Sequence, residues 1–212
     1  MNEQKISYLL YAAQDLTPAQ RGQRLLQQCA PQLLALGLEG LQILVHDQDV
    51  KTPPTAPRMW GPKPFVAQVN IWFNAEQVLQ RQRYEQVLGS AGFALHGWLV
   101  DEWLYTEYGE NSWQTPRDWP DGSRSPGVVA ITIIQRPPRI AQDEWMRRWF
   151  AWQSPMSEWL QPRSRYVRNL LTKAITPQAP AYDGIVEEAW PSHEQVVDKK
   201  KFFNASNNCQ LV

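Results

Sequence analysis

Four side chains of this sequence are candidates for acid–base chemistry, and two of them are histidines. His46 closes an apolar run and is followed by Asp47 and Asp49, whose carboxylates could orient its imidazole as a general base. His96 lies within an aromatic-rich run, where facing an interior would perturb its pKa. The structural alternatives are a solvated turn at His46 and a hydrogen-bonded core histidine at His96.

The other two candidates are Asp183 and Glu187. They stand at even spacing in residues 182–190, a run with strand composition, so alternation puts both on one face and sends Glu188 to the other. A carboxylate buried on such a face needs a partner or a raised pKa. The available partners are Arg165, Tyr166 and Arg168. A structural ion pair that joins neighbouring strands is the alternative to catalysis.

The aromatic residues are the second unusual feature, because the chain contains 11 tryptophans. Such a surplus suits either a bulky core or the wall of a pocket for flat, apolar ligands. Residues 140–160 have helical spacing, and their stripe consists of Trp145, Trp149, Trp152, Met156 and Leu160. Pro155 interrupts this helix, which predicts a kink or a restart capped by Ser154.

The elements that must position these side chains begin with a strand over residues 5–13. Thr17 opens a capping box for a helix that ends at Gly37, and Asn74 opens another for a helix that extends to about Leu88. Further strands are predicted over residues 41–45, 65–72 and 94–105. The order β-α-β-β-α-β is that of a ferredoxin-like unit.

The pattern then begins again after a loop over residues 108–126. Strands are predicted over residues 127–135, 166–172 and 182–190. Residues 72–79 align with residues 190–197 at Trp, Glu, Gln and Val, with caps at Asn74 and Ser192, and Asn169 overlies His46. We interpret this as an internal duplication with a first unit at 1–110, a linker at 111–126 and a second unit at 127–212.

The duplication leaves the second unit one strand short. The counterpart of residues 94–105 should begin where the chain reaches Val212. The strand is lost, is supplied by a partner chain, or is missing from a shortened polypeptide. An unpaired sheet edge could recruit another chain, so a homodimer is one expected partner state.

Composition excludes several classes of function. The 212 residues carry 21 basic and 21 acidic side chains, and this zero net charge argues against nucleic-acid binding and against a polybasic membrane surface. No apolar run of about 18 residues and no secretory signal are present, so a cytoplasmic location is expected. Cys29 and Cys209 lack metal-ligand spacing and are expected to be reduced thiols. Because phosphate-loop and zinc motifs are also missing, we expect no metal.

Three motifs of the second half resemble those of the EthD family. They are Trp149-x-x-x-Gln153-x-Pro155, the run Arg165-Tyr-Val-Arg-Asn169, and the run Tyr182-Asp-Gly-Ile-Val-Glu187. The resemblance covers residues 127–205 and implies an α+β fold, in which two tandem ferredoxin-like units form a pseudo-dimeric α+β barrel. It also implies an apolar pocket between sheet and helices, which takes a small apolar or aromatic metabolite without a tightly bound cofactor.

The sequence departs from the family at Gln153, where family members commonly have histidine. Glutamine cannot accept or donate a proton near neutral pH. Two functions follow: an EthD-like protein that assists oxidation, cyclisation or rearrangement of its ligand, or a binding or assembly module that has lost catalysis. Expected ligand contacts come from Trp72, Trp149, Gln153, Tyr166, Asn169 and Trp190.

Overall fold

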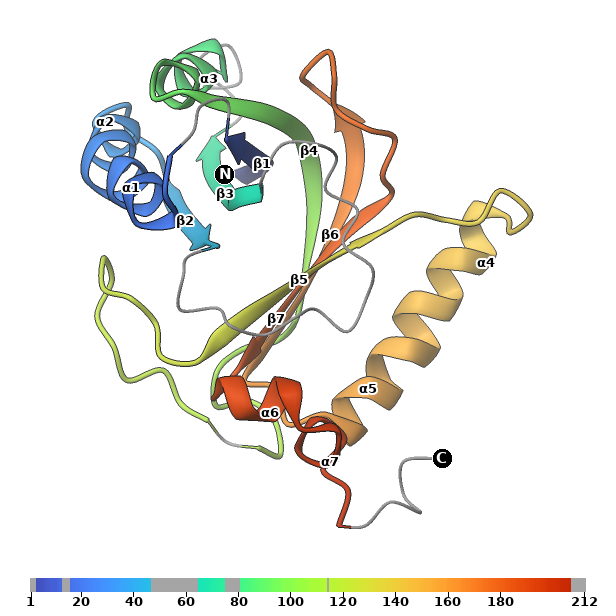
Figure 1. The fold of residues 1–212 in the computed structure, drawn as a ribbon. Helices are drawn as coiled ribbons and strands as arrows, with labels where there is room; N and C mark the ends of the chain where they lie inside the picture. Colours follow the sequence, from blue (N-terminus) through green and yellow to red (C-terminus); the bar gives the residue numbers. More distant parts are fainter. Residues whose placement is uncertain (1–2, 13–15, 47–64, 75–80, 114, 207–212) are drawn as a thin grey trace. The chain divides into compact units, whose positions relative to one another are not determined.

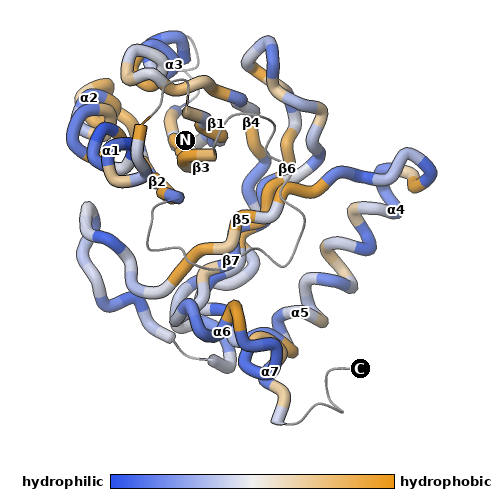
Figure 2. The backbone as a smooth tube through the Cα atoms, viewed as in Figure 1, coloured by the Kyte–Doolittle hydropathy of each residue, from blue (hydrophilic) through white to orange (hydrophobic). Residues whose placement is uncertain are grey.

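A computed structural model describes residues 3–12, 16–46, 65–74, 81–113 and 115–206. The chain is α+β, and its strands belong to one seven-stranded sheet. It divides into two compact units, of which unit 1 comprises Met1–Asp101 with Leu171–Ala181 and unit 2 comprises Glu102–Leu170 with Tyr182–Val212. Hydrophobic residues concentrate in the strands (Figure 2).

Unit 1 pairs its strands antiparallel in the order β2-β3-β1-β4 (Figure 1). The strands are β1 (Glu3–Ala12), β2 (Gly40–Val45), β3 (Phe65–Asn74) and the first part of β4 (Phe93–Thr106). The helices are α1 (Pro18–Gln23), the π-helical η1 (Arg24–Cys29), α2 (Ala30–Leu34) and α3 (Arg81–Ser90). The capping box at Thr17 is confirmed, whereas the box expected after Asn74 lies outside the described residues.

The two faces of the unit 1 sheet differ because side chains alternate along each strand. One face packs on the helices as an apolar core that includes Leu25, Cys29 and Val69. The polar residues Ser7, Gln68 and Asn70 are also fully buried. Ser7 Oγ donates to Asn70 Oδ1 at 2.8 Å, and Gln68 Nε2 donates to Ser7 Oγ at 3.0 Å. Thus unit 1 has an apolar layer under its helices and keeps its buried polar network elsewhere on the sheet.

Cys29 provides a test of the unit 1 core. Its side chain is 1 % exposed, and burial raises the pKa of the thiol from 9.0 to about 11, against a smaller opposing effect of Arg24. A raised pKa means that the neutral thiol stabilises the fold below pH 9 and that this advantage is lost as the pH rises through 11. Relative to Cys29→Ala, the wild type should lose about 1–3 kcal/mol of unfolding free energy over that window.

Urea denaturation of both proteins from pH 8 upward measures this difference. The comparison is made in a Cys209→Ser background, so that Cys29 is the only thiol present. Parallel pH profiles for the two proteins would show that the thiol is not desolvated as the structure requires.

Unit 2 contains the rest of β4 and the elements of the second half of the chain. Its strands are β5 (Val128–Ile134), β6 (Arg165–Ala174) and β7 (Gly184–Trp190), and β7 pairs antiparallel with both β5 and β6. Its helical segments are α4 (Gln142–Arg147), the π-helical η3 (Arg148–Gln153), α5 (Ser154–Leu160), α6 (His193–Val197) and α7 (Lys199–Phe202). The strand order of the whole sheet is β2-β3-β1-β4-β6-β7-β5.

The π turn corrects the predicted helical stripe. α4, η3 and α5 form one continuous helix (Figure 1), which buries Trp145, Trp149, Ser154 and Ser157 and leaves Trp152 and Met156 exposed. A π turn holds more residues than an α turn, so every position after it rotates relative to the expected face. The π turn lies just before Pro155. This position agrees with the chemistry of proline, which lacks an N–H to donate and whose ring clashes with the carbonyl of the preceding turn.

Candidate functional site

The sheet of unit 2 places functional side chains on two faces. Tyr166 of β6 contacts Trp149 of η3, so this side chain lies in the layer between the sheet and the long helix. Asn169 lies an odd number of positions after Tyr166 along β6, so their side chains point to opposite faces of the sheet. The Asn169 side chain contacts Glu187 of β7. Glu187 and its neighbour Glu188 therefore have different partners, since Glu188 pairs with Arg163.

The helix-side layer contains a set of hydrogen-bonded side chains centred on the Tyr166 hydroxyl. We call it the Tyr166 cluster and define it as Trp149, Gln153, Ser154, Tyr166 and Arg168. Trp149 Nε1 donates to Tyr166 Oη at 3.3 Å, and Tyr166 Oη donates to Gln153 Oε1 at 3.4 Å. Ser154 Oγ lies 3.3 Å from the same hydroxyl. Trp149 and Gln153 both belong to the π turn, and both hydrogen-bond to the hydroxyl oxygen of Tyr166.

Arg168 is the charged member of the cluster and is only 6 % exposed. Its guanidinium lies 3.9 Å from the ring centroid of Phe150 and 4.7 Å from that of Tyr105, and its Nη1 donates to Ser154 Oγ at 3.3 Å. Within the described ranges, no carboxylate forms an ion pair with it. Burial lowers the pKa of this guanidinium, but arginine remains protonated in proteins. A buried cation without a counter-ion is costly, so the layer is suited to receive negative charge.

Two neighbouring residues position the cluster. The Arg163 guanidinium lies 4.0 Å from the centroid of the Tyr166 ring and is fully buried between Glu188, at 2.6 Å, and Glu158, at 3.2 Å. Gly184 leaves room for the indole of Trp149, because a Cβ at residue 184 would lie 2.8 Å from Trp149 Cη2. Arg163 thus holds the phenol ring, and the missing side chain of Gly184 admits the tryptophan.

The cluster reaches solvent at Gln153. Trp149, Ser154, Tyr166 and Arg168 are buried, whereas Gln153 is exposed. The buried Tyr166 hydroxyl is therefore one hydrogen bond away from a side chain in contact with water. The hydroxyl accepts from Trp149 and donates to Gln153, so it can orient a polar ligand, but the amide of Gln153 cannot carry a proton onward to solvent.

Unit 1 shows that the fold does not require this polar layer. Its helix also has a π turn that begins at an arginine and is followed by a proline, with Arg24 and Pro31 at the same spacing as Arg148 and Pro155. There the helix packs on an apolar core that includes Leu25, Cys29 and Leu33. The same Arg-to-Pro spacing is thus visible in the sequence at both π turns. From the sequence, Arg168 is expected only as a partner for Asp183 or Glu187.

A second group of charged residues surrounds Glu187, which is 2 % exposed. Asn169 Nδ2 donates to Glu187 Oε1 at 2.9 Å, and Arg165 Nη1 lies 3.8 Å from Glu187 Oε2. Arg165 Nε also donates to Glu107 at 3.1 Å. Burial raises the pKa of the nearby Tyr108, an effect that Arg165 opposes and that Glu107 and Glu187 reinforce. This group holds an acid that is already paired and hydrogen-bonded.

The remaining acid–base candidates lie elsewhere. Asp183 precedes β7, and its Oδ2 accepts from the backbone N–H of Arg136 at 2.7 Å. His46 and His96 belong to unit 1. The His46 ring lies 5.9 Å from the Phe65 ring, and the His96 ring lies 4.9 Å from the Tyr11 ring. Asp183 thus has a backbone partner outside the Tyr166 cluster, and the two histidines have aromatic neighbours within unit 1.

The two other expected ligand contacts also have separate surroundings. Lys5 Nζ lies 4.6 Å from the centroid of the Trp72 ring in unit 1. In unit 2, Trp190 stacks on Phe202 of α7 with ring centroids 4.7 Å apart. Of the six residues expected to contact a ligand, the structure thus brings Trp149, Gln153 and Tyr166 together.

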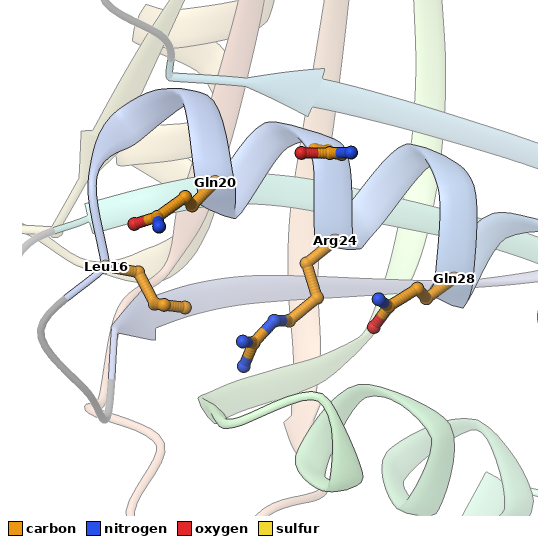
Figure 3. Close-up of a pocket in the computed structure, with 5 residues that line it drawn as sticks. Leu16, Gln20, Arg24 and Gln28 are labelled. Atoms are coloured by element: carbon orange, nitrogen blue, oxygen red, sulfur yellow. The ribbon is translucent and has the colours of Figure 1, made fainter.

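A pocket of about 180 Å³ is formed on unit 1 (Figure 3). Its lining is Leu16, Gln20, Gln23, Arg24 and Gln28. Amide and guanidinium groups dominate this lining, which lacks the aromatic walls typical of sites for flat ligands. It does not match the expected site for an apolar metabolite.

Comparison with known proteins identifies the fold. No protein-family model and no curated protein matches the sequence. A crystal structure of an anthrone oxidase-like protein is similar, with a TM-score of 0.56 and 14 % sequence identity over 90 % of this chain and 74 % of that one. The likeness shows an α+β fold compatible with the dimeric α+β barrels. EthD membership is not supported by a family match and stays a prediction.

The described residues contain no group of three or more His, Cys, Asp or Glu that could hold a metal ion. Among those residues, the helices are too short or too polar to span a bilayer.

Proposed function

We propose that this protein binds a small apolar or aromatic metabolite at the Tyr166 cluster and assists its oxidation, cyclisation or rearrangement without a tightly bound cofactor. The observation that carries the proposal is the buried Arg168 guanidinium beside the Tyr166 hydroxyl. Reactions of this kind pass through an enolate or phenolate, in which negative charge develops on oxygen. A preorganised cation in a desolvated layer stabilises that charge.

The other members of the cluster have roles that follow from their positions. Trp149 and Phe150 meet edge-to-face with ring centroids 5.0 Å apart and form the aromatic part of the layer that a flat ring would contact. The Tyr166 hydroxyl, which donates to Gln153 in the structure, is placed to donate a hydrogen bond to the ligand oxygen on which the charge develops. The proton that the ligand releases passes to water, because the amide of Gln153 cannot accept it. The group around Glu187 is the second candidate for acid–base chemistry, because it contains a buried carboxylate.

The proposal also includes a family relationship for the chain. We infer that the chain consists of two tandem ferredoxin-like units, at 1–110 and 127–212, and that the second is EthD-like. In support, the strand order is β2-β3-β1 in one half and β6-β7-β5 in the other, which is second-third-first in each. The first helix of each half also contains a π turn followed by a proline.

The proposal is tested with anthrone, chosen because the similar crystal structure is of an anthrone oxidase-like protein. The carbon opposite the carbonyl loses a proton, the resulting oxyanion reacts with O₂, and anthraquinone and water are released. Arg168→Met should lower kcat about 100-fold or more, since removal of one oxyanion-stabilising group has that effect in other enzymes. Arg168→Lys should retain part of the activity because it keeps the charge.

Arg139→Met is the matched control, since Arg139 is an exposed arginine outside the cluster. Anthraquinone absorbance and O₂ uptake measure turnover, and circular dichroism verifies folding. Equal activity of the wild type and Arg168→Met would contradict the proposal. Failure of the wild type to bind anthrone and related polycyclic phenols would contradict it as well.

The alternative is a binding or assembly module without catalysis. Gln153 favours it, because a side chain that cannot exchange a proton occupies the solvent-facing position of the cluster. Anthrone binding without O₂ uptake would support this alternative. In that case Gln153→His should introduce turnover if the site is that of an enzyme that has lost its proton-transfer group.

A further inference from the structure

The outward side of the long helix carries three large apolar side chains. Trp152 is 66 % exposed, Met156 is 58 % exposed and Trp159 is 79 % exposed. We call these three residues the outer helix face. Its apolar area is on the order of 400 Å², which is the size of patch that usually marks an interaction site on a monomer.

The π turn creates this exposure. In an uninterrupted α-helix, Trp152 and Met156 would fall on the same side as the buried Trp149. The structure instead buries Ser154 and Ser157 at the positions that follow Trp149. A helix that buries serines and exposes tryptophans loses hydrophobic stabilisation as a monomer, so the outer helix face needs a partner that covers it.

We propose that the outer helix face docks against the same face of a second copy of this chain, with the two helices antiparallel and the two-fold axis at Met156. An isologous interface must be self-complementary. Trp152 lies about 6 Å before Met156 along the helix and Trp159 about 4.5 Å after it. In the antiparallel pair, each Trp152 therefore lies opposite the partner's Trp159, and the two Met156 side chains meet at the axis.

The charges at the helix ends are complementary in this arrangement. Arg147 and Arg148, exposed at the N-terminal side, lie just beyond the C-terminal end of the partner's α5, whose last carbonyls carry partial negative charge. Both arginines share the carboxylate of Glu144, so the local net charge is small. A helix that binds an anionic bilayer carries more basic charge than this, which favours a protein partner.

The area and composition also fit a protein interface. A standard interface takes about 800 Å² from each partner, and the outer helix face supplies about half of that in apolar surface. Exposed Ala151, Pro155 and the two arginines surround it and can supply the rim. Tryptophan, methionine and arginine are the residue types that are enriched where binding energy concentrates.

The experiment uses sedimentation velocity over a wide range of concentrations. The wild type should show a concentration-dependent dimer. Met156→Glu should weaken it about 100-fold or more, because the axis brings the two carboxylates together. Met156→Lys should weaken it similarly. An equimolar mixture of these two variants should restore the dimer, since opposite charges then meet at the axis.

Leu26→Glu is the control, because Leu26 is an exposed leucine of unit 1 outside the outer helix face. It should leave the dimer unchanged. A monomeric wild type at all concentrations would overturn the proposal, as would a dimer that Met156→Glu leaves intact. Co-sedimentation of the monomeric wild type with phosphatidylserine vesicles, abolished by Trp152→Ser, would assign the face to a membrane surface instead.

Discussion

Replacement of Arg163 with alanine is expected to lower the free energy of unfolding by about 3–5 kcal/mol. Arg163 is fully buried, and it pairs with Glu188 at 2.6 Å and with Glu158 at 3.2 Å. Its removal leaves two partly buried carboxylates without their cation and takes the guanidinium away from the Tyr166 ring. The loss therefore comes mainly from uncompensated charge rather than from the value of the ion pairs themselves.

Urea denaturation followed by tryptophan fluorescence measures this effect. Arg148→Ala is the matched control, since Arg148 pairs with Glu144 at 2.6 Å but has a side chain that is 60 % exposed, and the loss should not exceed about 1 kcal/mol. The triple variant Arg163→Met, Glu158→Gln, Glu188→Gln should recover much of the stability because no charge is left unpaired. Similar losses for Arg163→Ala and Arg148→Ala would contradict the burial of Arg163.

Replacement of Gly127 with alanine is expected to destabilise unit 2 by roughly 3 kcal/mol or more. Gly127 has φ of +76°, a conformation that side chains disfavour, and its Cβ would overlap the carbonyl oxygen of Trp190. The backbone of β5 enters the sheet against the end of β7 at this residue. A side chain would therefore have to separate the two strands at their first pair, Val128 with Trp190.

Gly122 provides an internal control for this experiment. Its φ of +77° is almost the same, but an added Cβ would have nothing within 4 Å. Gly122→Ala should therefore show only the conformational cost of about 1–2 kcal/mol. Thermal unfolding of the two variants separates the free-energy cost of a positive φ from that of the steric clash at residue 127. Equal shifts in Tm would mean that β5 and β7 tolerate a side chain at residue 127.

Local signals in the sequence predicted the elements of the fold. The Thr17 and Ser192 capping boxes are both present, because each depends on residues within one helical turn. The strands β6 and β7 lie where β-branched and aromatic runs predicted them. Alternation also separated Glu187 from Glu188 correctly, since a strand sends successive side chains to opposite faces.

The long helix shows where local signals were insufficient. Its spacing predicted one stripe through Trp152 and Met156, but the π turn rotates both to solvent. An α turn and a π turn differ by one residue, and the π turn here includes Trp149, which packs closely on Gly184 of a distant strand. Hydrophobic periodicity assumes a constant twist and cannot detect that change.

For the candidate site, the sequence by itself determined its members Trp149, Gln153 and Tyr166, through motifs that resemble the EthD family. Only the tertiary structure decided that these three side chains converge on one hydroxyl and that Arg168 lies beside it without a carboxylate partner in the described residues. It also decided that Glu187 and Asp183 are not part of that cluster. The physical reason is that composition and spacing specify which side chains share a face, whereas the neighbours of a buried charge come from segments distant in sequence.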